Sequence, residues 1–416
     1  MSLASTWSDL KSLTPSQKKT VLAAYLGWTL DAFDFFILVF VLKHIADEFG
    51  TDVKSVALAI TLTLAVRPIG ALIFGLAADR YGRRPVLMVD VLLYSILEFA
   101  SGFAPTLTML IVLRTLYGVA MGGEWGVGAS LALETIPPKT RGAISGLLQA
   151  GYPSGYLLAA VLFYGLFPYI GWRGMFMVGA LPALLVLYIR RHVDESPAFI
   201  VRQQAATPSP GVWTVIRAHF GKLIYAVLLM TAFNFFSHGT QDIYPTFLET
   251  QRGFSTDTVG LIAIVYNIGA IIGGIGFGVL SEHIGRRKAM VIAALLAIPV
   301  IPLWAFTTTP MMLALGAFLM QVAVQGAWGV VPAYLNELSP EEVRGTFPGF
   351  SYQLGNLLAS INATLQTGIA EARGGDYATA MAVVIGVVAV AVALLAGFGR
   401  EARGVVFGKR SVVPAD

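Results

Sequence analysis

Long apolar segments, joined by short polar connections, occupy most of this chain of 416 residues. A helix that crosses a lipid bilayer needs about 20 apolar residues, so the length allows roughly a dozen such helices and no large domain outside the membrane. Charged residues make up only 12% of the chain, which is about half of their usual share in soluble proteins. The sequence therefore predicts an all-α polytopic membrane protein of about 12 transmembrane helices. The expected spans are 20–42, 53–77, 85–104, 107–133, 142–166, 173–191, 222–248, 255–280, 289–307, 311–336, 345–370 and 377–399.

The distribution of Lys and Arg predicts the orientation of the chain. Positive residues concentrate in connections that face the cytoplasm. Here they gather in both tails and on alternate connections, and the remaining connections hold only Lys43, Lys54, Arg173, Arg252 and Arg373. We therefore expect both termini and the long middle connection to be cytoplasmic. Residues 1–20 are polar and the first apolar run is too long for a cleavable signal, so we expect a multi-pass protein of the cell inner (plasma) membrane.

The two halves of the sequence repeat each other. Residues 75–84 read GLAADRYGRR and residues 278–287 read GVLSEHIGRR. The same offset of 203 residues recurs at Trp125/Trp328, Glu134/Glu337 and Arg141/Arg344. The polar stretch QQAATPSPG near the midpoint is typical of a linker. We expect a six-helix bundle over 1–200, a cytoplasmic linker over 201–221 and a second six-helix bundle with a short tail over 222–416. Parallel six-helix repeats with a site between them are a transporter architecture.

These motifs resemble those of the major facilitator superfamily. The resemblance rests on the loop G-x-x-x-D-R-x-G-R-R at Gly75 and its copy at Gly278, on the run Arg114-x-x-x-Gly118-x-x-x-Gly122, and on the segment DESP at 194–197. It implies the fold of that superfamily and the transport of a small solute. We expect the charged loop residues to cap helix ends across the seam and to latch a cytoplasmic gate, with Glu134 paired to Arg141 and Glu337 to Arg344. The expected gating residues are Asp79, Arg83, Glu134, Arg141, Glu282, Arg286, Glu337 and Arg344.

A polar stripe interrupts the seventh span. Asn234, His238, Gln241 and Asp242 follow a spacing that places them on one helical face. A stripe of this kind cannot face lipid, so we expect it to face a central cavity. His238 and Asp242 can form a charged pair or share a proton, and Pro245 can kink the helix. A buried network that only joins helices is the alternative.

The same stretch supports a narrower resemblance. Residues 234–246 match N-x-x-[S/T]-H-x-[S/T]-Q-D-x-x-x-T at every fixed position. In this they resemble the fungal lactate and pyruvate permeases and their bacterial relatives in the sialate:proton symporter family. The resemblance implies proton-coupled transport of a short monocarboxylate, with this stripe in substrate recognition. Analogy with the permeases adds Gln353. Sialate carriers belong to the same broad family, so the identity of the acid stays open.

Ionisable residues in the spans of the first half are functional candidates, because each is unfavourable in lipid. Asp31 and Asp34 lie one turn apart, where two carboxylates repel and one binds a proton more readily. In related sugar and acid symporters an Asp on the first span faces an Arg on the fourth, and Asp34 and Arg114 hold those positions. A structural ion pair is the alternative there. Arg67 can grip an anionic substrate or pair with a nearby Asp, and Glu124 is a second proton site or a buried hydrogen-bonded residue.

These observations lead to one mechanism. An organic acid is an anion at neutral pH, and a proton carried with it would cancel its charge. We predict alternating access by two rocking halves. The expected proton-coupling residues are Asp31, Asp34, Glu124, His238 and Asp242, and the expected substrate-binding residues are Arg67, Arg114, Asn234, His238, Gln241 and Gln353. We expect Asp90 to support the loop motif, and we assign no role to Glu98.

Other classes of protein fit the sequence less well. A symporter for sialate or an aromatic acid, an exporter or antiporter, and a nutrient sensor remain as alternatives, although a sensor usually needs longer cytoplasmic tails. The chain has no Cys, which excludes disulfides and thiolate metal sites. It also carries no catalytic or phosphate-binding motif, so we do not expect an enzyme. We expect no cofactor beyond the proton gradient, no metal and no nucleic-acid partner. We expect a monomer in the lipid bilayer.

Overall fold

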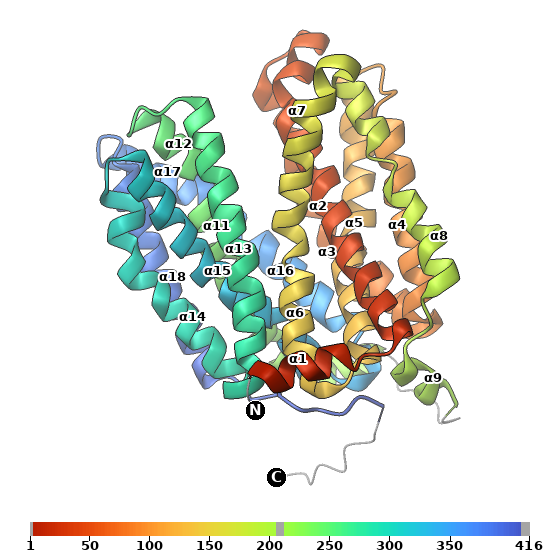
Figure 1. The fold of residues 1–416 in the computed structure, drawn as a ribbon. Helices are drawn as coiled ribbons and strands as arrows, with labels where there is room; N and C mark the ends of the chain where they lie inside the picture. Colours follow the sequence, from red (N-terminus) through yellow and green to blue (C-terminus); the bar gives the residue numbers. More distant parts are fainter. Residues whose placement is uncertain (1–2, 205–211, 409–416) are drawn as a thin grey trace.

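The computed structural model describes residues 3–204 and 212–408, and this part of the chain is helical without any β-strand (Figure 1). The first half contains α1 (Leu3–Lys11), α2 (Pro15–Phe49), α3 (Val53–Tyr81), α4 (Arg83–Ser101), α5 (Leu107–Thr135), α6 (Arg141–Gln149), α7 (Gly151–Val178), α8 (Pro182–His192) and α9 (Pro197–Gln204). The second half contains α10 (Val212–Ala218), α11 (Phe220–Gln241), α12 (Tyr244–Thr250), α13 (Thr256–Ile284), α14 (Arg286–Ile301), the π-helix η2 (Pro302–Phe306), α15 (Pro310–Leu338), α16 (Phe347–Ala359), α17 (Asn362–Ala372) and α18 (Tyr377–Phe398). The centre of the expected linker lies outside the described residues, and the bundle boundaries stay predictions.

Nine helical segments among the described residues are long and apolar enough to cross a membrane. One of them, Pro138–His192, covers the expected fifth and sixth spans together. The expected third span corresponds to α4, which carries four charged residues, and the expected eleventh is divided between α16 and α17. The polytopic helical fold is therefore confirmed, whereas the count of twelve spans and the orientation of the termini stay predictions.

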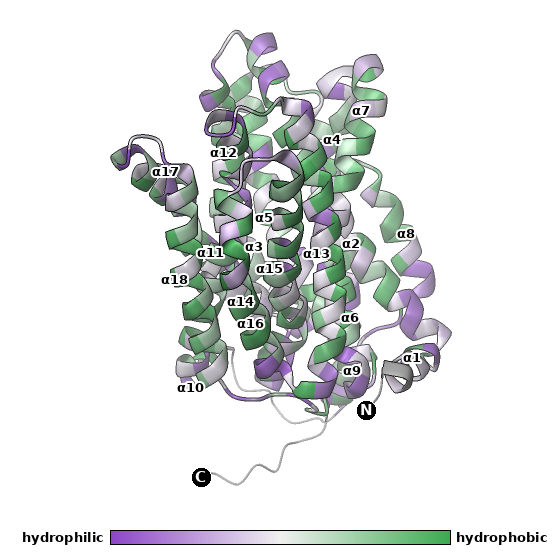
Figure 2. Cartoon of the chain, turned by 60° about the vertical axis from the view of Figure 1, so that its left-hand side comes forward, coloured by the Kyte–Doolittle hydropathy of each residue, from purple (hydrophilic) through white to green (hydrophobic). Residues whose placement is uncertain are grey.

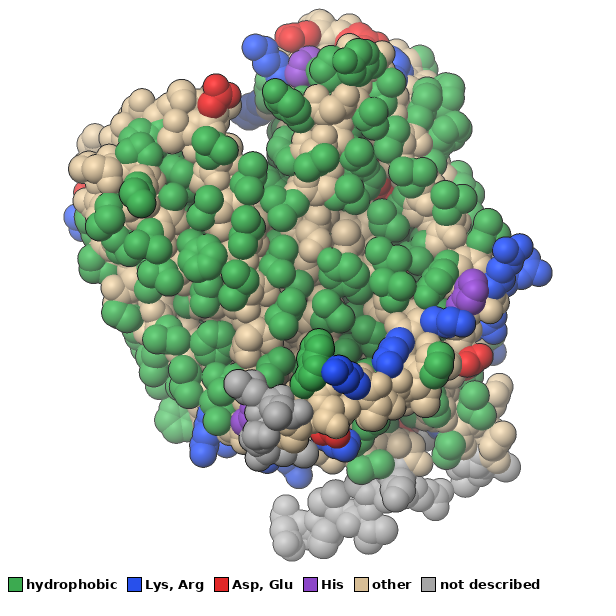
Figure 3. All heavy atoms as spheres, viewed as in Figure 1, with side chains coloured by type: hydrophobic (Ala, Val, Ile, Leu, Met, Phe, Trp, Pro, Cys, Tyr) green, Lys and Arg blue, Asp and Glu red, His purple; other side chains and the backbone are tan. Residues whose placement is uncertain are grey.

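The helices form two lobes that are parted at one end and in contact at the other (Figure 1). At the contacting end α1 lies across the lobes. Here α6 packs against α13 and α15, and α16 packs against α3 and α5, so each half reaches over to the other. We call this end the closed end and the opposite one the open end. A cleft between the lobes is visible at the open end in Figure 3.

Apolar side chains cover the sides of both lobes on the face shown in Figure 3, and the ribbon in Figure 2 is coloured as hydrophobic along much of the helices. Ile73 on α3, Leu261 on α13 and Val387 on α18 are each more than half exposed. Charged side chains gather mainly near the ends of the helices (Figure 3). An apolar belt of this extent needs lipid around it, so the protein is a multi-pass membrane protein.

The repeated loop motif has the same backbone conformation in both halves. Gly82 and Gly285 separate α3 from α4 and α13 from α14, with φ of 108° and 99°. Residues with a Cβ rarely adopt such angles, so glycine is required where the chain turns from one helix into the next. This turn places Arg83 and Arg286 at the first position of the following helix.

Glycine also allows the two halves to meet at the closed end. Gly142 and Gly146 of α6 lie against Gly274 and Gly278 of α13. A Cβ at Gly146 would overlap the carbonyl oxygen of Gly274, and a Cβ at Gly278 would overlap that of Gly142. Small residues of this kind let membrane helices approach backbone to backbone.

We predict that Gly146→Ala separates α6 from α13 and destabilises the protein by about 1–3 kcal/mol, as overpacking does elsewhere. Gly276→Ala on α13 is the matched control, because no described atom lies within 4 Å of its Cβ position. Thermal unfolding of the purified proteins should show a lower melting temperature for Gly146→Ala alone. Equal melting temperatures would mean that this contact does not hold the halves together.

Candidate functional site

His238 lies at the centre of the polar stripe on α11. One ring nitrogen is 3.1 Å from Asp242 Oδ1, and the other is 3.0 Å from Asn356 Oδ1 of α16. The side chains of His238 and Asp242 are 31% and 36% exposed. The pair is thus held by hydrogen bonds and is still accessible to a small solute. The contact between His238 and Asp242 that the sequence predicts is present.

Side-chain amides connect the stripe to α15. Gln241 donates a hydrogen bond to Gln321 Oε1 at 3.0 Å, and Gln321 donates one to Thr240 Oγ1 at 3.0 Å. Gln325 donates to Ser237 Oγ at 3.1 Å. The network fixes the rotamers of these side chains, so the stripe presents an ordered set of polar groups.

Two expected substrate-binding residues lie apart from this network. Asn234 is buried and donates to the carbonyl of Met230 in its own helix, at 2.8 Å. Gln353 of α16 is 1% exposed, and neither of its amide atoms has a hydrogen-bond partner within the described residues. A buried amide without a partner is unfavourable, so Gln353 is available to a ligand or to water.

The helix breaks beside the stripe. α11 ends at Gln241, and α12 begins at Tyr244 with Pro245 in its first turn. Proline lacks the N–H that would continue the helical hydrogen bonds. The kink expected at Pro245 is therefore present, and it places Asp242 at the end of α11.

Arg67 of α3 is the basic residue expected at the substrate site in the first half, and it is 4% exposed. Its guanidinium lies 3.7 Å from Asp31 of α2 and 5.7 Å from the centre of the Phe35 ring. Arg67 is thus a nearly buried cation of the first half, whereas the His238–Asp242 pair of the second half is partly exposed.

Arg114 of α5 pairs with Glu98 of α4 and not with Asp34, so the expected Asp34–Arg114 pair is wrong for this conformation. Both members of the observed pair are fully buried, and the guanidinium lies 3.9 Å from the centre of the Tyr117 ring. The role of Glu98 does not follow from the sequence, because its partner Arg114 lies on another helix. One sequence feature could have indicated such a pair. The spans of the first half contain more acids than arginines, so the two arginines must choose among several acids.

Three further buried acids, Asp34, Asp90 and Glu124, have no hydrogen-bond partner in the described part of the chain. Asp34 and Glu98 both border Gly179, so both lie near Arg114. An ionised carboxylate without a partner is unfavourable in such surroundings. Within residues 3–204 and 212–408, no group of three or more His, Asp or Glu side chains is arranged to hold a metal ion.

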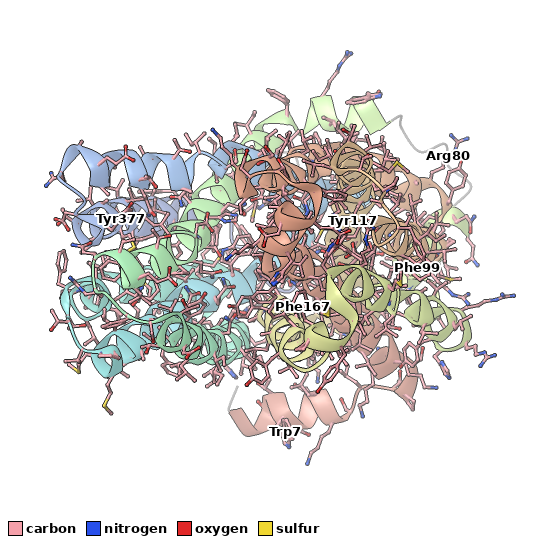
Figure 4. All side chains as sticks on the ribbon, turned by 90° about the horizontal axis from the view of Figure 1, so that it is seen from above. Trp7, Arg80, Phe99, Tyr117, Phe167 and Tyr377 are labelled. Atoms are coloured by element: carbon pink, nitrogen blue, oxygen red, sulfur yellow. The ribbon has the colours of Figure 1, made fainter. Side chains whose placement is uncertain are left out.

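Aromatic rings join the two halves beside the stripe. Trp125 and Trp328, which the repeat relates, pack on Tyr352 with ring centres 4.8 and 5.5 Å away. Trp328 also donates a hydrogen bond to the carbonyl of Phe233 at 3.0 Å. Figure 4, which looks down from the open end, shows Tyr117 inside the first half and Phe167 near the boundary of the lobes.

The charged residues of the repeated loops pair across the halves at the closed end. Glu134 lies 3.8 Å from Arg344, and Glu337 lies 3.8 Å from Arg141. The expected pairs, Glu134 with Arg141 and Glu337 with Arg344, are absent from the described ion pairs and were wrong. The reason is that Arg141 is the first residue of α6 and Arg344 lies three residues before α16, and both helices pack against the opposite half. Within each half the ion pairs are Arg83–Asp79 at 3.1 Å, Arg83–Glu134 at 3.2 Å, Arg286–Glu282 at 3.1 Å and Arg286–Glu337 at 2.9 Å.

Asp79 and Glu282 form the contacts across the seam that the sequence predicts, whereas the expected pairing of Arg83 and Arg286 across the seam was wrong, because their described ion pairs lie within their own halves. Asp79 accepts hydrogen bonds from the amides of Gly345 and Thr346 at 2.8 and 3.0 Å, and from the Thr346 hydroxyl at 2.7 Å. Glu282 accepts one from the amide of Gly142 at the start of α6. Each acid thus caps a helix of the other half, where the helix dipole favours a negative charge.

Two carboxylates without an expected role cap α4 and α14. Glu195 accepts hydrogen bonds from the amides of Arg83 and Arg84 at 3.0 and 3.1 Å. Glu401 does the same for Arg286 and Arg287 at 3.1 and 3.2 Å. Burial raises the pKa of Glu195, although these hydrogen bonds act against the rise. The DESP segment pointed to Glu195 in the sequence. The hydrogen bonds of Glu195 to the start of α4 do not follow from the sequence.

Known families and proteins resemble this chain in sequence and in fold. Residues 24–241 match the family described as Major Facilitator Superfamily, and residues 220–402 match the one described as Sugar (and other) transporter. The chain belongs to the major facilitator superfamily. Among solved structures of similar fold is the proton:xylose symporter XylE, with a TM-score of 0.78 at 18% identity, over 94% of this chain and 98% of that one. The human organic anion transporter MFSD10 gives 0.69 at 16% identity, over 91% and 100%.

Relatives within the superfamily are more similar in sequence. The chain is 30% identical to the carboxylic acid transporter protein homolog of Saccharomyces cerevisiae, over 91% of this chain and 67% of that protein. It is 31% identical to a probable 4-methylmuconolactone transporter of Cupriavidus pinatubonensis, over 84% and 83%. It is 29% identical to the sialic acid transporter NanX of Escherichia coli, over 88% and 91%. The roles of the individual site residues stay predictions.

We predict that Asp34 replaces Glu98 as the counter-ion of Arg114 when Glu98 is removed. Glu98→Gln alone should then cost little stability, whereas Glu98→Gln with Asp34→Asn leaves a buried cation unpaired, which costs about 3–5 kcal/mol. Thermal unfolding should show a loss in the double variant that exceeds the sum of the single losses.

The matched control is Glu98→Gln with Asp90→Asn. Asp90 lies on the same helix and is buried, but no described ion pair or hydrogen bond joins it to Arg114. The losses of stability in Glu98→Gln and Asp90→Asn should add up in the double variant. Additive losses in the Asp34 combination as well would contradict a shared arginine.

Proposed function

We propose that this protein is a secondary active transporter that carries a short monocarboxylate of the lactate and pyruvate class together with a proton. The proposal rests on the partly exposed His238–Asp242 pair of α11 and on Arg67 of α3, whose guanidinium lies 3.7 Å from Asp31. The first half thus offers a cation for a carboxylate, and the second half offers an acid and an imidazole for a proton. Relatives named as transporters of organic acids support the substrate class at that coarser level.

Arg67 is the group best suited to bind the substrate carboxylate. A guanidinium can bind both carboxylate oxygens at once. Its separation of 3.7 Å from Asp31 is longer than a direct hydrogen bond, so an incoming carboxylate can compete with Asp31. Arg114 is less accessible, because it is fully buried against Glu98. Gln241 and Gln353 then serve the carbonyl or hydroxyl group next to the carboxylate.

A proton makes the uptake of such an anion favourable. Moving one negative charge into a cell that is negative inside costs about 2.3 kcal/mol per 100 mV. A proton that travels with the anion cancels this charge, and an inward pH gradient can then drive accumulation. A carrier of this kind needs a cation for the anion and at least one acid for the proton.

The acids available for the proton lie on both sides of the cleft. Asp242 and His238 are partly exposed and can exchange a proton with the cleft directly. Asp34 and Glu124 are fully buried, and binding a proton removes the unfavourable burial of their charge. Asp31 connects the two roles, because a proton on Asp31 would release Arg67 to the substrate.

The closed end provides the other part of an alternating-access cycle. With the predicted orientation, the cleft faces the outside and the closed end faces the cytoplasm. The pairs Glu134–Arg344 and Glu337–Arg141 then latch this outward-facing state. Release of the substrate to the inside requires these pairs to separate while the open end closes.

A symporter for sialate or an aromatic acid is the second candidate. The likeness to a sialic acid transporter favours it, as do the rings of Trp125, Tyr352 and Trp328 beside the stripe. Competition by pyruvate against sialate and benzoate for the same uptake decides between the two. An exporter on the same fold would show the opposite effect of the pH gradient on uptake.

We predict that Asp34→Asn and Asp242→Asn abolish gradient-driven accumulation, while counterflow exchange without a gradient continues. Asp257→Asn is the matched control, because this acid is exposed at the start of α13. If both Asp variants still accumulate substrate like the unmodified protein, the proton assignments are wrong.

Arg67→Lys should raise KM at least about tenfold, since an ammonium group cannot replace a bidentate guanidinium contact.

A further inference from the structure

An apolar groove on the outer wall lies apart from the proposed transport site. It has a volume of about 530 Å³, and its walls come from the segment 10–25 and from α6 and α13. It therefore spans the seam between the two halves. The apolar residues that the argument uses are Leu13, Leu22, Ile144, Leu147, Ile275 and Val279.

The surroundings of the groove indicate what covers it. Leu22 on its border is 45% exposed, and Ile272, one turn of α13 toward the open end, is 53% exposed. These residues belong to the apolar belt that faces lipid, so the groove opens into the bilayer and not into water. An apolar groove of this volume can hold an acyl chain.

The adjacent helix α1 lies at the level of the lipid head groups. It crosses the closed end (Figure 1), and its Trp7 is 62% exposed with the Lys11 ammonium 5.4 Å from the ring centre. Trp and Lys are typical of the boundary between the hydrocarbon core and water. A lipid whose chain fills the groove would place its head group beside α1.

The charged side chains at the rim of the groove, beside α1, favour one type of lipid head group. Lys18 lines the groove and donates a hydrogen bond to the carbonyl of Lys11 at 2.9 Å. The acid of α1, Asp9, is already paired with Lys139 at 2.5 Å. Figure 3 shows Lys and Arg side chains along this edge of the molecule. The rim is therefore positive, and basic residues beside membrane helices attract anionic lipids.

We propose that the groove binds an anionic phospholipid, with an acyl chain lying along α6, α13 and the segment 10–25 and the phosphate on Lys18. The bound lipid contacts both halves at the closed end. This inference is independent of the transported acid and of proton coupling.

Photo-crosslinking in the membrane tests the position of the chain. The full-length protein is reconstituted with phosphatidylglycerol that carries a diazirine on its acyl chain, illuminated and digested. We expect labelled peptides from 10–25, 143–147 and 275–279. Val279→Trp should fill the groove and lower this labelling several-fold. Ile272→Trp, on the same helix but outside the groove, should not. Labelling that is absent from these peptides, or unchanged in Val279→Trp, would overturn the proposal.

A neighbouring pair of lysines tests the head group. Diazirine phosphatidylglycerol should label the groove about fivefold more than the matching phosphatidylcholine, the effect of one basic residue near a charged lipid. Lys18→Ala should abolish this preference, and Lys19→Ala should preserve it, because Lys19 is exposed and does not line the groove. Equal labelling by both lipids in the unmodified protein would contradict an anionic occupant. If Val279→Trp does not give a monodisperse protein, the lysine comparison decides.

Discussion

Burial of charge away from water is the constraint on which the rest of this structure depends. An ionised side chain among membrane helices needs a partner of opposite charge or a proton. Arg67 meets this need with Asp31, and Arg114 meets it with Glu98. Asp34 forms no ion pair with either arginine in the described part of the chain, and in the proposed mechanism this acid binds a proton. If that mechanism holds, the distribution of two cations among several acids links structural stability to proton coupling.

The same constraint ties the cleft to the closed end. There the ion pairs are formed between the halves, because Glu134 and Glu337 each face an arginine of the opposite half. When the halves separate, water enters and solvates these charges, and exposed pairs contribute little. The ion pairs Glu134–Arg344 and Glu337–Arg141 therefore stabilise the closed end mainly while water is excluded from it. In the proposed mechanism, neutralisation of the site by substrate and proton would then shift the balance between the two states.

The sequence predicts the parts of this protein that depend on local periodicity. The apolar spans, the offset between Gly82 and Gly285 and the polar face around His238 all follow from spacing along one chain. Partners across helices do not, because nothing in the spacing of Glu98 or Glu134 indicates which arginine lies opposite. The swapped pairs at Arg141 and Arg344 result from how α6 and α16 cross the seam. The capping contact of Glu195 is likewise a product of tertiary packing.

Proton-coupled transport of a monocarboxylate can be tested by the uptake of radiolabelled L-lactate into proteoliposomes, with and without an imposed inside-alkaline pH gradient. We expect accumulation above the external concentration only with the gradient, and its collapse when a protonophore is added. Uptake by folded protein that is indifferent to the gradient would contradict proton coupling. No uptake at all would contradict the monocarboxylate assignment and leave only the membership of the superfamily.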